Sequence, residues 1–147
     1  MNIKLNIKKL DDRAIIPSYG SEYAAGADLY AVLDEPLTID PHTTAFVHTG
    51  IAFELPLGYV GLVFARSGLA CKRDLAPANK VGVIDCDYRG EIIVAIHNHS
   101  DLVQTIEHGE RIAQLVITPY VTAEFCECEE LSDTVRGAGG FGSTGSK

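Results

Sequence analysis

The sequence predicts an all-β domain. Three observations support this prediction: short apolar runs rich in β-branched residues recur along the chain, Gly and Pro separate them, and only one segment resembles a helix. Many short strands at regular spacing are typical of an antiparallel sandwich, a jelly roll or a barrel. A chain of 147 residues suits one domain. At this size roughly 68% of the unfolded surface is buried on folding, so a core forms without disulfides.

The expected strands follow one another at short intervals. Residues 3–8 alternate strictly, with Ile3, Leu5 and Ile7 on one face, as in a half-buried strand. A single helix is expected at 67–74, with Ser67 as its N-cap and a proline beyond its end. The other expected strands, separated by turn residues, are 28–32, 44–55, 59–65, 91–98, 111–118 and 123–128.

The last twelve residues, RGAGGFGSTGSK, differ in composition from the rest and contain five of the fourteen glycines. Glycine-rich ends are usually flexible linkers. Arg136 and Phe141 favour another interpretation, because an anion binder and an aromatic surface among small residues suit a tail that closes over a ligand. We therefore divide the chain into a β domain, 1–135, and a flexible C-terminal arm, 136–147.

Charge and cysteine usage exclude several classes of partner. The formal net charge of −8 argues against sequence-independent binding of nucleic acid and against an anionic membrane surface. The N-terminus lacks the continuous apolar stretch of a signal peptide, and no apolar run approaches the length of a membrane span. Four cysteines are too few and too irregularly spaced for a disulfide scaffold. We expect a cytoplasmic protein with no nucleic-acid or membrane partner.

Two segments suggest binding of cations and anions. Small residues lead to Asp28 at the start of a strand, where an aspartate either caps a turn or holds the water shell of a hard cation. Arg66, Ser67 and Gly68 follow a strand where a helix begins. Helix N-termini and arginine both favour anions, although an ordinary helix start with a surface arginine has the same pattern.

The segment 79–91 has the densest set of chemically useful residues. Asp85 directly follows an apolar strand, which places a carboxylate at a pocket mouth where it can orient or deprotonate water. Tyr88 can present a ring face to a sugar or base, and Asn79 has the donor and acceptor that reading a base edge needs. The alternative is an ordinary hairpin turn, in which Asp and Gly are common.

The remaining candidates are weaker or are excluded. Arg111 and Gln114 enter a strand three residues apart, so we expect them on opposite faces. His97 and His99 share a face but lack a third metal ligand, and the Cys-x-Cys pair at 126–128 lacks the second pair of a zinc site. The signatures of P-loop NTPases and of zinc deaminases are absent.

Taken in order, these segments closely resemble the five motifs of the trimeric dUTP pyrophosphatase (dUTPase) family. The matches are AGADLYA at 25–31, RSGLA at 66–70, GVIDCDYRGE at 82–91, GERIAQ at 109–114 and RGAGGFGSTG at 136–145. The resemblance implies a distorted jelly-roll-like β-barrel and a homotrimer with active sites shared between subunits. It implies hydrolysis of dUTP to dUMP and pyrophosphate, with Mg²⁺ as cofactor, which keeps uracil out of DNA and supplies dUMP for thymidylate synthesis.

The resemblance also implies catalytic roles at the matching positions. Asp85 would activate the attacking water, and Tyr88 would pack on the deoxyribose and exclude a 2′-hydroxyl. Asp28 would hold the metal through water, while the ion itself lies mainly on the triphosphate. Many family members carry Pro where this chain has Ala65, and we expect this departure to be tolerated because Arg66 keeps its place.

Binding roles follow in the same way. The uracil base would be contacted by Asn79, by the backbone around Val83 and Ile84, and by the ring of Phe141. The residues implied to bind the phosphates are Arg66, Ser67, Gly68, Gln114, Arg136, Gly142 and Ser143.

Two other functions stay open at this point. A dCTP deaminase, or a bifunctional deaminase and dUTPase, shares the implied fold, but it would be expected to carry a Glu base and a different third motif. A non-enzymatic jelly-roll interaction module would not need Asp85, Tyr88 and the arm together.

Overall fold

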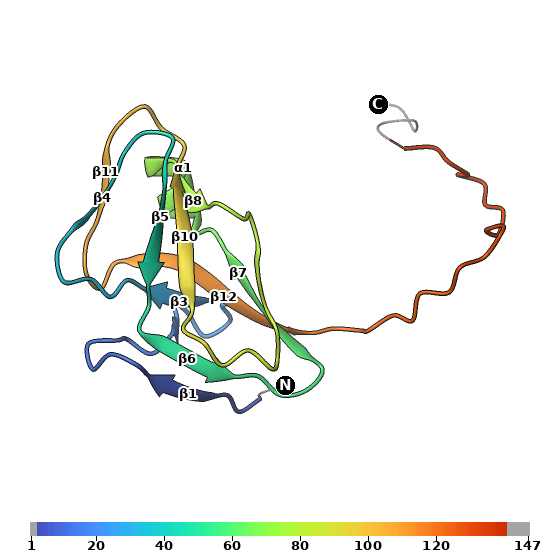
Figure 1. Cartoon of the computed structure of the whole chain (residues 1–147), viewed down its shortest axis with the longest axis horizontal. Coiled ribbons are helices and arrows are strands. Elements are labelled where there is room, and N and C mark those ends of the chain that lie inside the picture. The colour runs from blue at the N-terminus through green and yellow to red at the C-terminus, as the bar shows by residue number, and fades with distance from the viewer. Residues whose placement is uncertain (1–2, 141–147) are drawn as a thin grey trace.

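The computed structural model describes residues 3–140 and confirms the all-β prediction, with one short helix, α1 (Ser67–Arg73) (Figure 1). The strands are β1 (Asn6–Lys9), β2 (Ser18–Tyr19), β3 (Ala27–Tyr30), β4 (Leu37–Ile39), β5 (Thr44–His48), β6 (Ile51–Glu54), β7 (Tyr59–Phe64), β8 (Leu75–Pro77), β9 (Gly82–Ile84), β10 (Ile93–Asn98), β11 (Gln104–Ile106) and β12 (Arg111–Pro119).

All strand pairs between the described elements are antiparallel. The largest sheet has the order β2-β3-β12-β7-β9, and a second has the order β5-β10-β8. The pairs β1-β6 and β11-β4 complete the structure. In Figure 1, β5 and β10 cross the direction of β12, so the domain is built from packed sheets and not from one continuous closed ladder.

The hydrophobic core is drawn from both large sheets. Buried and less buried residues alternate in β7 and β10, as antiparallel strands with one solvated face require, whereas Ala27–Leu29 of β3 and Ile51–Phe53 of β6 are buried at consecutive positions. The fully buried aliphatic side chains with no more than 1% exposure are Leu29, Ile39, Val47, Ile51, Leu75, Ile96, Ile106 and Ile112. These residues belong to different ladders, so the sheets stabilise one another through a shared core.

Two predicted strands differ clearly from the structure, the others before residue 119 differ by one or two residues at an end, and β2, β4, β8 and β11 lie outside the predicted strands. The alternating N-terminal segment pairs with β6 only over Asn6–Lys9, although Ile7 is half-buried as expected. The run 44–55 is two strands, β5 and β6, separated at Thr49 and Gly50. Gly50 has a φ of 66°, a left-handed conformation that favours glycine, and apolar periodicity gave no sign of this turn.

The helix is confirmed, but its predicted cap is wrong. Arg66 is the N-cap residue of α1 and Ser67 is its first helical residue, and no side chain caps the helix. At the other end Asp74 adopts a left-handed conformation with a φ of 53°. No helix among residues 3–140 is long and apolar enough to cross a membrane.

The predicted strand at 123–128 is wrong for this chain. After Pro119 the described residues form neither strand nor helix, and Figure 1 shows the segment running away from the sheets. Val121 and Phe125 are almost fully exposed. A strand needs a neighbour to satisfy its backbone hydrogen bonds, and in this chain the segment lies beside none.

The buried Asn98 side chain generates a stability prediction. Its Nδ2 donates to the carbonyls of Ile39 and Leu102 at 3.0 and 2.7 Å, and its Oδ1 accepts from the Ser100 backbone at 3.0 Å. Because Asn98→Ala removes the donor to the buried Ile39 carbonyl and the acceptor of the Ser100 N–H, we expect the free energy of unfolding to fall by about 3 kcal/mol in urea denaturation. The exposed control Asn6→Ala should change it by less than about 0.5 kcal/mol, and equal losses would contradict the assignment.

Candidate functional site

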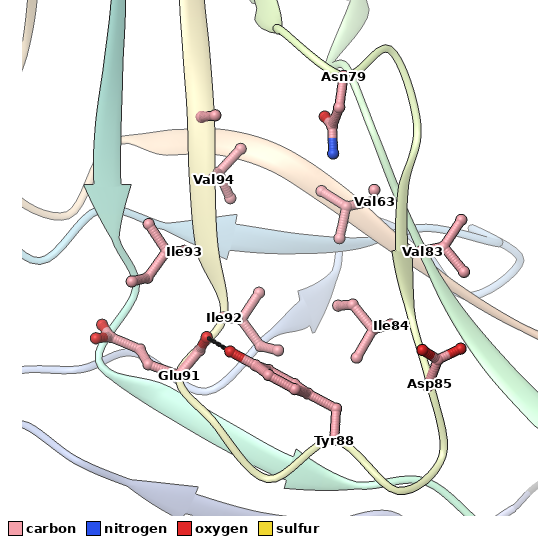
Figure 2. A pocket seen from close by; sticks show the side chains of 12 residues that line it. Val63, Asn79, Val83, Ile84, Asp85, Tyr88, Glu91, Ile92, Ile93 and Val94 are labelled. Carbon is pink, nitrogen blue, oxygen red and sulfur yellow. Dashed lines mark hydrogen bonds between the residues drawn. The ribbon is translucent and has the colours of Figure 1, made fainter.

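A pocket of about 240 Å³ lies between β9, the loop that follows it and β10 (Figure 2). Apolar side chains, including Val63, Ile84 and Val94, form its inner wall. The polar residues that line it are Asn79, Asp85, Tyr88 and Glu91. The segment 79–91 is therefore more than an ordinary hairpin turn, because it lines a pocket. Asp85 is one of the lining residues, as expected.

Local backbone geometry places Asp85 and Tyr88. Asp85 is exposed and directly follows β9, and its carbonyl accepts the Tyr88 N–H at 3.1 Å. The Tyr88 hydroxyl donates to the Glu91 carbonyl at 2.9 Å (Figure 2). The ring lies against Gly90, where a Cβ would come within 2.3 Å of the Tyr88 hydroxyl oxygen. Only glycine at this position leaves room for the ring.

The two β9 residues predicted to contact the base face opposite ways. Ile84 is buried and points into the pocket, whereas Val83 is 64% exposed on the other side of the strand (Figure 2). Strand alternation explains this difference. A contact between a base and Val83 would therefore use the Val83 backbone, as the resemblance to the dUTPase family implied.

A second cluster of predicted site residues surrounds Asp28 on β3. The carboxylate is largely buried, and its Oδ1 accepts from Arg66 Nε at 2.7 Å while Oδ2 accepts from Arg111 Nη1 at 3.4 Å. Gln114 on β12 is the register partner of Asp28, and its Nε2 donates to the Ala65 carbonyl at 2.8 Å. The cluster combines two guanidinium groups, one carboxylate and one amide.

Arg111 is a member of this cluster that the sequence did not place there. We expected it on the face opposite Gln114, and this prediction is wrong. The register shifts between Arg111 and Ala113, a β-bulge that interrupts the alternation and turns the Arg111 side chain toward Asp28. Simple alternation contains no signal for such an insertion.

The other predicted phosphate-binding residues lie at α1 and in the C-terminal segment. Ser67 and Gly68 are exposed at the first turn of α1, next to Arg66. Arg136 is exposed, and its Nε donates to the Gly139 carbonyl at 2.8 Å. Figure 1 shows this segment far from the sheets. Three predicted residues lie outside the described residues: Phe141, Gly142 and Ser143.

A contact between Tyr120 and Cys86 links the pocket loop to the start of the C-terminal segment. The Tyr120 hydroxyl lies 3.8 Å from the Cys86 sulfur, next to Asp85 in the chain. This contact, together with the nearby carboxylates of Asp85 and Asp87, raises the pKa of Tyr120.

Within one chain, the predicted residues fall into three places. The pocket brings together Asn79, Val83, Ile84, Asp85 and Tyr88, and its lining does not include the Asp28 cluster or Arg136. Residues 3–140 contain no group of three or more His, Cys, Asp or Glu side chains placed to hold a metal ion.

The fold is an all-β domain of antiparallel sheets, with a pocket at segment 79–91 and a separate cluster of two arginines around Asp28. A family model described as dUTPase matches residues 12–145. The chain belongs to the dUTPase family.

Curated relatives support the same assignment over nearly the whole chain. The deoxyuridine 5'-triphosphate nucleotidohydrolase of Nautilia profundicola is 52% identical over 143 residues, covering 97% of this chain and 99% of the relative. The enzyme of the same name from Desulfitobacterium hafniense is 49% identical, covering 99% of this chain and 97% of the relative.

Solved structures show the same fold. A mutant dUTPase of Staphylococcus bacteriophage 80alpha with dUpNHpp superposes with a TM-score of 0.86 at 31% identity, covering 98% of this chain and 99% of that one. A mutant dUTPase from phage phi11 of S. aureus, solved to describe the coordination of a structural Mg(II) ion, has a TM-score of 0.77 at 28% identity. That comparison covers 87% of this chain and 98% of the phage protein.

The burial of Asp28 generates a prediction on stability. Asp28→Asn removes the negative charge that two arginines share. We expect the free energy of unfolding to fall by about 2 kcal/mol. This loss is smaller than for a fully buried ion pair because the Arg111 side chain is half exposed. Asp34→Asn removes the partner of a 2.8 Å pair with Arg13 at an exposed position and serves as control. Thermal denaturation of both variants gives the comparison, and equal shifts would refute a special role for Asp28.

Proposed function

We propose that this protein hydrolyses dUTP to dUMP and pyrophosphate. The observation that carries the proposal is the pocket of segment 79–91, in which a carboxylate, a tyrosine ring and an amide meet over an apolar wall. Membership of the dUTPase family supports the same reaction. The activity lowers dUTP, which keeps uracil out of DNA, and it supplies dUMP for thymidylate synthesis.

The base and the sugar bind in the pocket. Uracil pairs with the Asn79 amide and the backbone of β9, and selection against cytosine depends on hydrogen bonds that cytosine cannot match. Selection against thymine requires a pocket too tight for a methyl group. The Tyr88 ring packs on the deoxyribose, and its fixed position excludes a 2′-hydroxyl. The Phe141 ring stacks on the base in this proposal.

The reaction is an attack by water on the α-phosphorus. Asp85 accepts a proton from that water as the new P–O bond forms, and the bond to the oxygen bridging the α- and β-phosphates breaks. Pyrophosphate leaves with that bonding electron pair. The phosphate oxygens are bound by Arg66, Ser67, Gly68 and Gln114, and Arg136, Gly142 and Ser143 clamp the terminal phosphates. These groups supply charge neutralisation and alignment.

Magnesium fits this site only as an indirect partner of the protein. Mg²⁺ prefers oxygen ligands and usually keeps several waters while bound to substrate phosphates. Asp28 offers a carboxylate, but both of its oxygens accept hydrogen bonds from Arg66 and Arg111. We therefore assign Mg²⁺ to the triphosphate, with Asp28 facing it through water. The ion would neutralise phosphate charge.

The complete site belongs to a homotrimer in this proposal. Phe46, Val83 and Ile93 expose large apolar side chains on β5, β9 and β10, of which β9 and β10 border the pocket. An apolar surface next to an incomplete site suits contact with another copy.

The division into a domain, 1–135, and a closing arm, 136–147, is part of the same proposal. Free thiols at all four cysteines suit a cytoplasmic location.

A pyrophosphate-release assay across the deoxynucleoside triphosphates, with and without Mg²⁺, tests the proposed reaction. We expect release from dUTP far above the other nucleotides. Ammonia release from dCTP would replace this function with deamination. No release from any nucleotide would favour the interaction module.

Asp85→Asn tests the catalytic base. The amide cannot take a proton from water, so we expect turnover of dUTP to fall by a factor of about 100 or more. Binding of the analogue dUpNHpp, measured by calorimetry, should persist. Asp87→Asn is a matched control because Asp87 is exposed two residues further along the same loop. Unchanged turnover in Asp85→Asn would remove the residue from this role.

Truncation after Val135 tests the arm. Loss of Arg136 and the residues beyond it removes the clamp on the terminal phosphates, so we expect most activity to disappear. The sheets end before this point, so the truncated protein should keep the oligomeric mass of the full chain in light scattering. A fully active truncated protein would return the arm to a linker.

A further inference from the structure

Glu91 closes the pocket loop and makes one side-chain hydrogen bond to the end of β5 and one to the turn between β5 and β6. Its Oε2 lies 2.8 Å from His48 Nδ1, and its Oε1 accepts the Gly50 N–H at 2.8 Å. The Glu91 side chain is 22% exposed, whereas that of His48 is 56% exposed. A carboxylate bound at both oxygens has little freedom, so it fixes the end of the loop to the turn.

The next residue, Ile92, is also hydrogen-bonded to the segment around this turn. The buried Thr49 hydroxyl donates to the Ile92 carbonyl at 2.5 Å, and the Ile92 N–H donates to the Ile51 carbonyl at 2.9 Å. Residues 48–51 and 91–92 are therefore joined by four hydrogen bonds. We refer to these six residues as the loop clamp.

The position of Tyr88 depends on this clamp. Its side chain is 46% exposed, so packing alone does not fix it, and its hydroxyl donates to the Glu91 carbonyl (Figure 2). The orientation of that carbonyl follows from the two side-chain bonds of Glu91 and from the Ile92 contacts. Movement of Glu91 would therefore move the acceptor that holds the tyrosine ring.

We propose that Glu91 and His48 are positioning residues for sugar selectivity, because they fix the carbonyl that orients Tyr88. The inference rests on the proposed function, in which the Tyr88 ring excludes the 2′-hydroxyl of a ribonucleotide. Neither residue touches the reacting phosphate. Their effect is therefore on the ratio of kcat/KM for dUTP to that for UTP, and a role confined to stability would not change this ratio.

The experiment measures this ratio in the full-length protein. We expect Glu91→Ala to lower it about fivefold, the effect of losing one net hydrogen bond. Glu91→Gln should recover most of the ratio because its carbonyl oxygen can still accept the Gly50 N–H. Tyr88→Phe keeps the ring but loses the bond to Glu91, so it should match Glu91→Ala. The double variant Tyr88→Phe with Glu91→Ala should fall no further.

A second histidine–carboxylate pair provides the control. His42 Nε2 lies 2.8 Å from Asp101 Oδ1, at the other end of the ladder between β5 and β10. Asp101→Ala should leave the ratio unchanged. Should Glu91→Ala fail to fold, His48→Ala carries the test, because His48 is more than half exposed and its loss frees one oxygen of Glu91.

The outcomes separate this inference from the proposed function. If Tyr88→Ala leaves the ratio unchanged, the assigned role of Tyr88 in sugar selection fails. If Tyr88→Ala lowers the ratio but Glu91→Ala and His48→Ala do not, the positioning role is overturned. It is also overturned if Asp101→Ala lowers the ratio as much as Glu91→Ala does.

Discussion

The central ladder formed by β3, β12, β7 and β9 determines where the chemistry lies. Asp28 lies on β3 and Gln114 on β12, while Arg66 and Asp85 follow shortly or directly after β7 and β9. Neighbouring strands lie about 5 Å apart, so the register sets the spacing of Asp28 and Gln114 directly and fixes where the segments that carry Arg66 and Asp85 begin. A slip of one residue would turn Gln114 to the other face of the sheet and separate it from Asp28. The buried aliphatic residues of these strands hold the register in place, and the site therefore depends on the core.

Burying Asp28 is unfavourable unless its charge is compensated, and the two arginines supply that compensation. The same arrangement holds two guanidinium groups in defined positions before any ligand arrives. Under the proposed function, Arg66 is already ordered by Asp28 when a phosphate binds, so it does not have to be ordered at that moment. An overall charge of −8 is compatible with this, because a small ligand experiences the local field and not the sum over the chain.

Local sequence patterns predicted individual strands better than they predicted the pairing between strands. Alternation at Ile7 and the apolar run leading to Asp85 describe single strands, and both were confirmed as strand features. The turn at Gly50 and the bulge beside Arg111 depend on which strands pair, and a period of two residues contains no information about pairing. The segment 123–128 has a strand-like composition but no neighbour in this chain, so composition alone gave the wrong result there. Asn79, Asp85 and Tyr88 were singled out by their chemistry and not by periodicity, the family resemblance added Val83 and Ile84, and Glu91 of the pocket lining was not predicted.

The separation of the pocket, the Asp28 cluster and Arg136 within one chain has a geometric consequence. The stretch from Pro119 to Arg136 spans at most about 60 Å when fully extended, a distance larger than the diameter of a small domain. Under the proposed function, a stretch of that reach lets the arm, 136–147, serve a pocket on another copy, and residues 120–140 make no strand pairing with the sheets of their own chain. Ordering the arm would then cost conformational entropy, which substrate contacts must offset each time the site closes. Under the proposed function, the arm therefore contributes selectivity through the triphosphate and the base, whereas the Tyr88 loop contributes selectivity through the sugar.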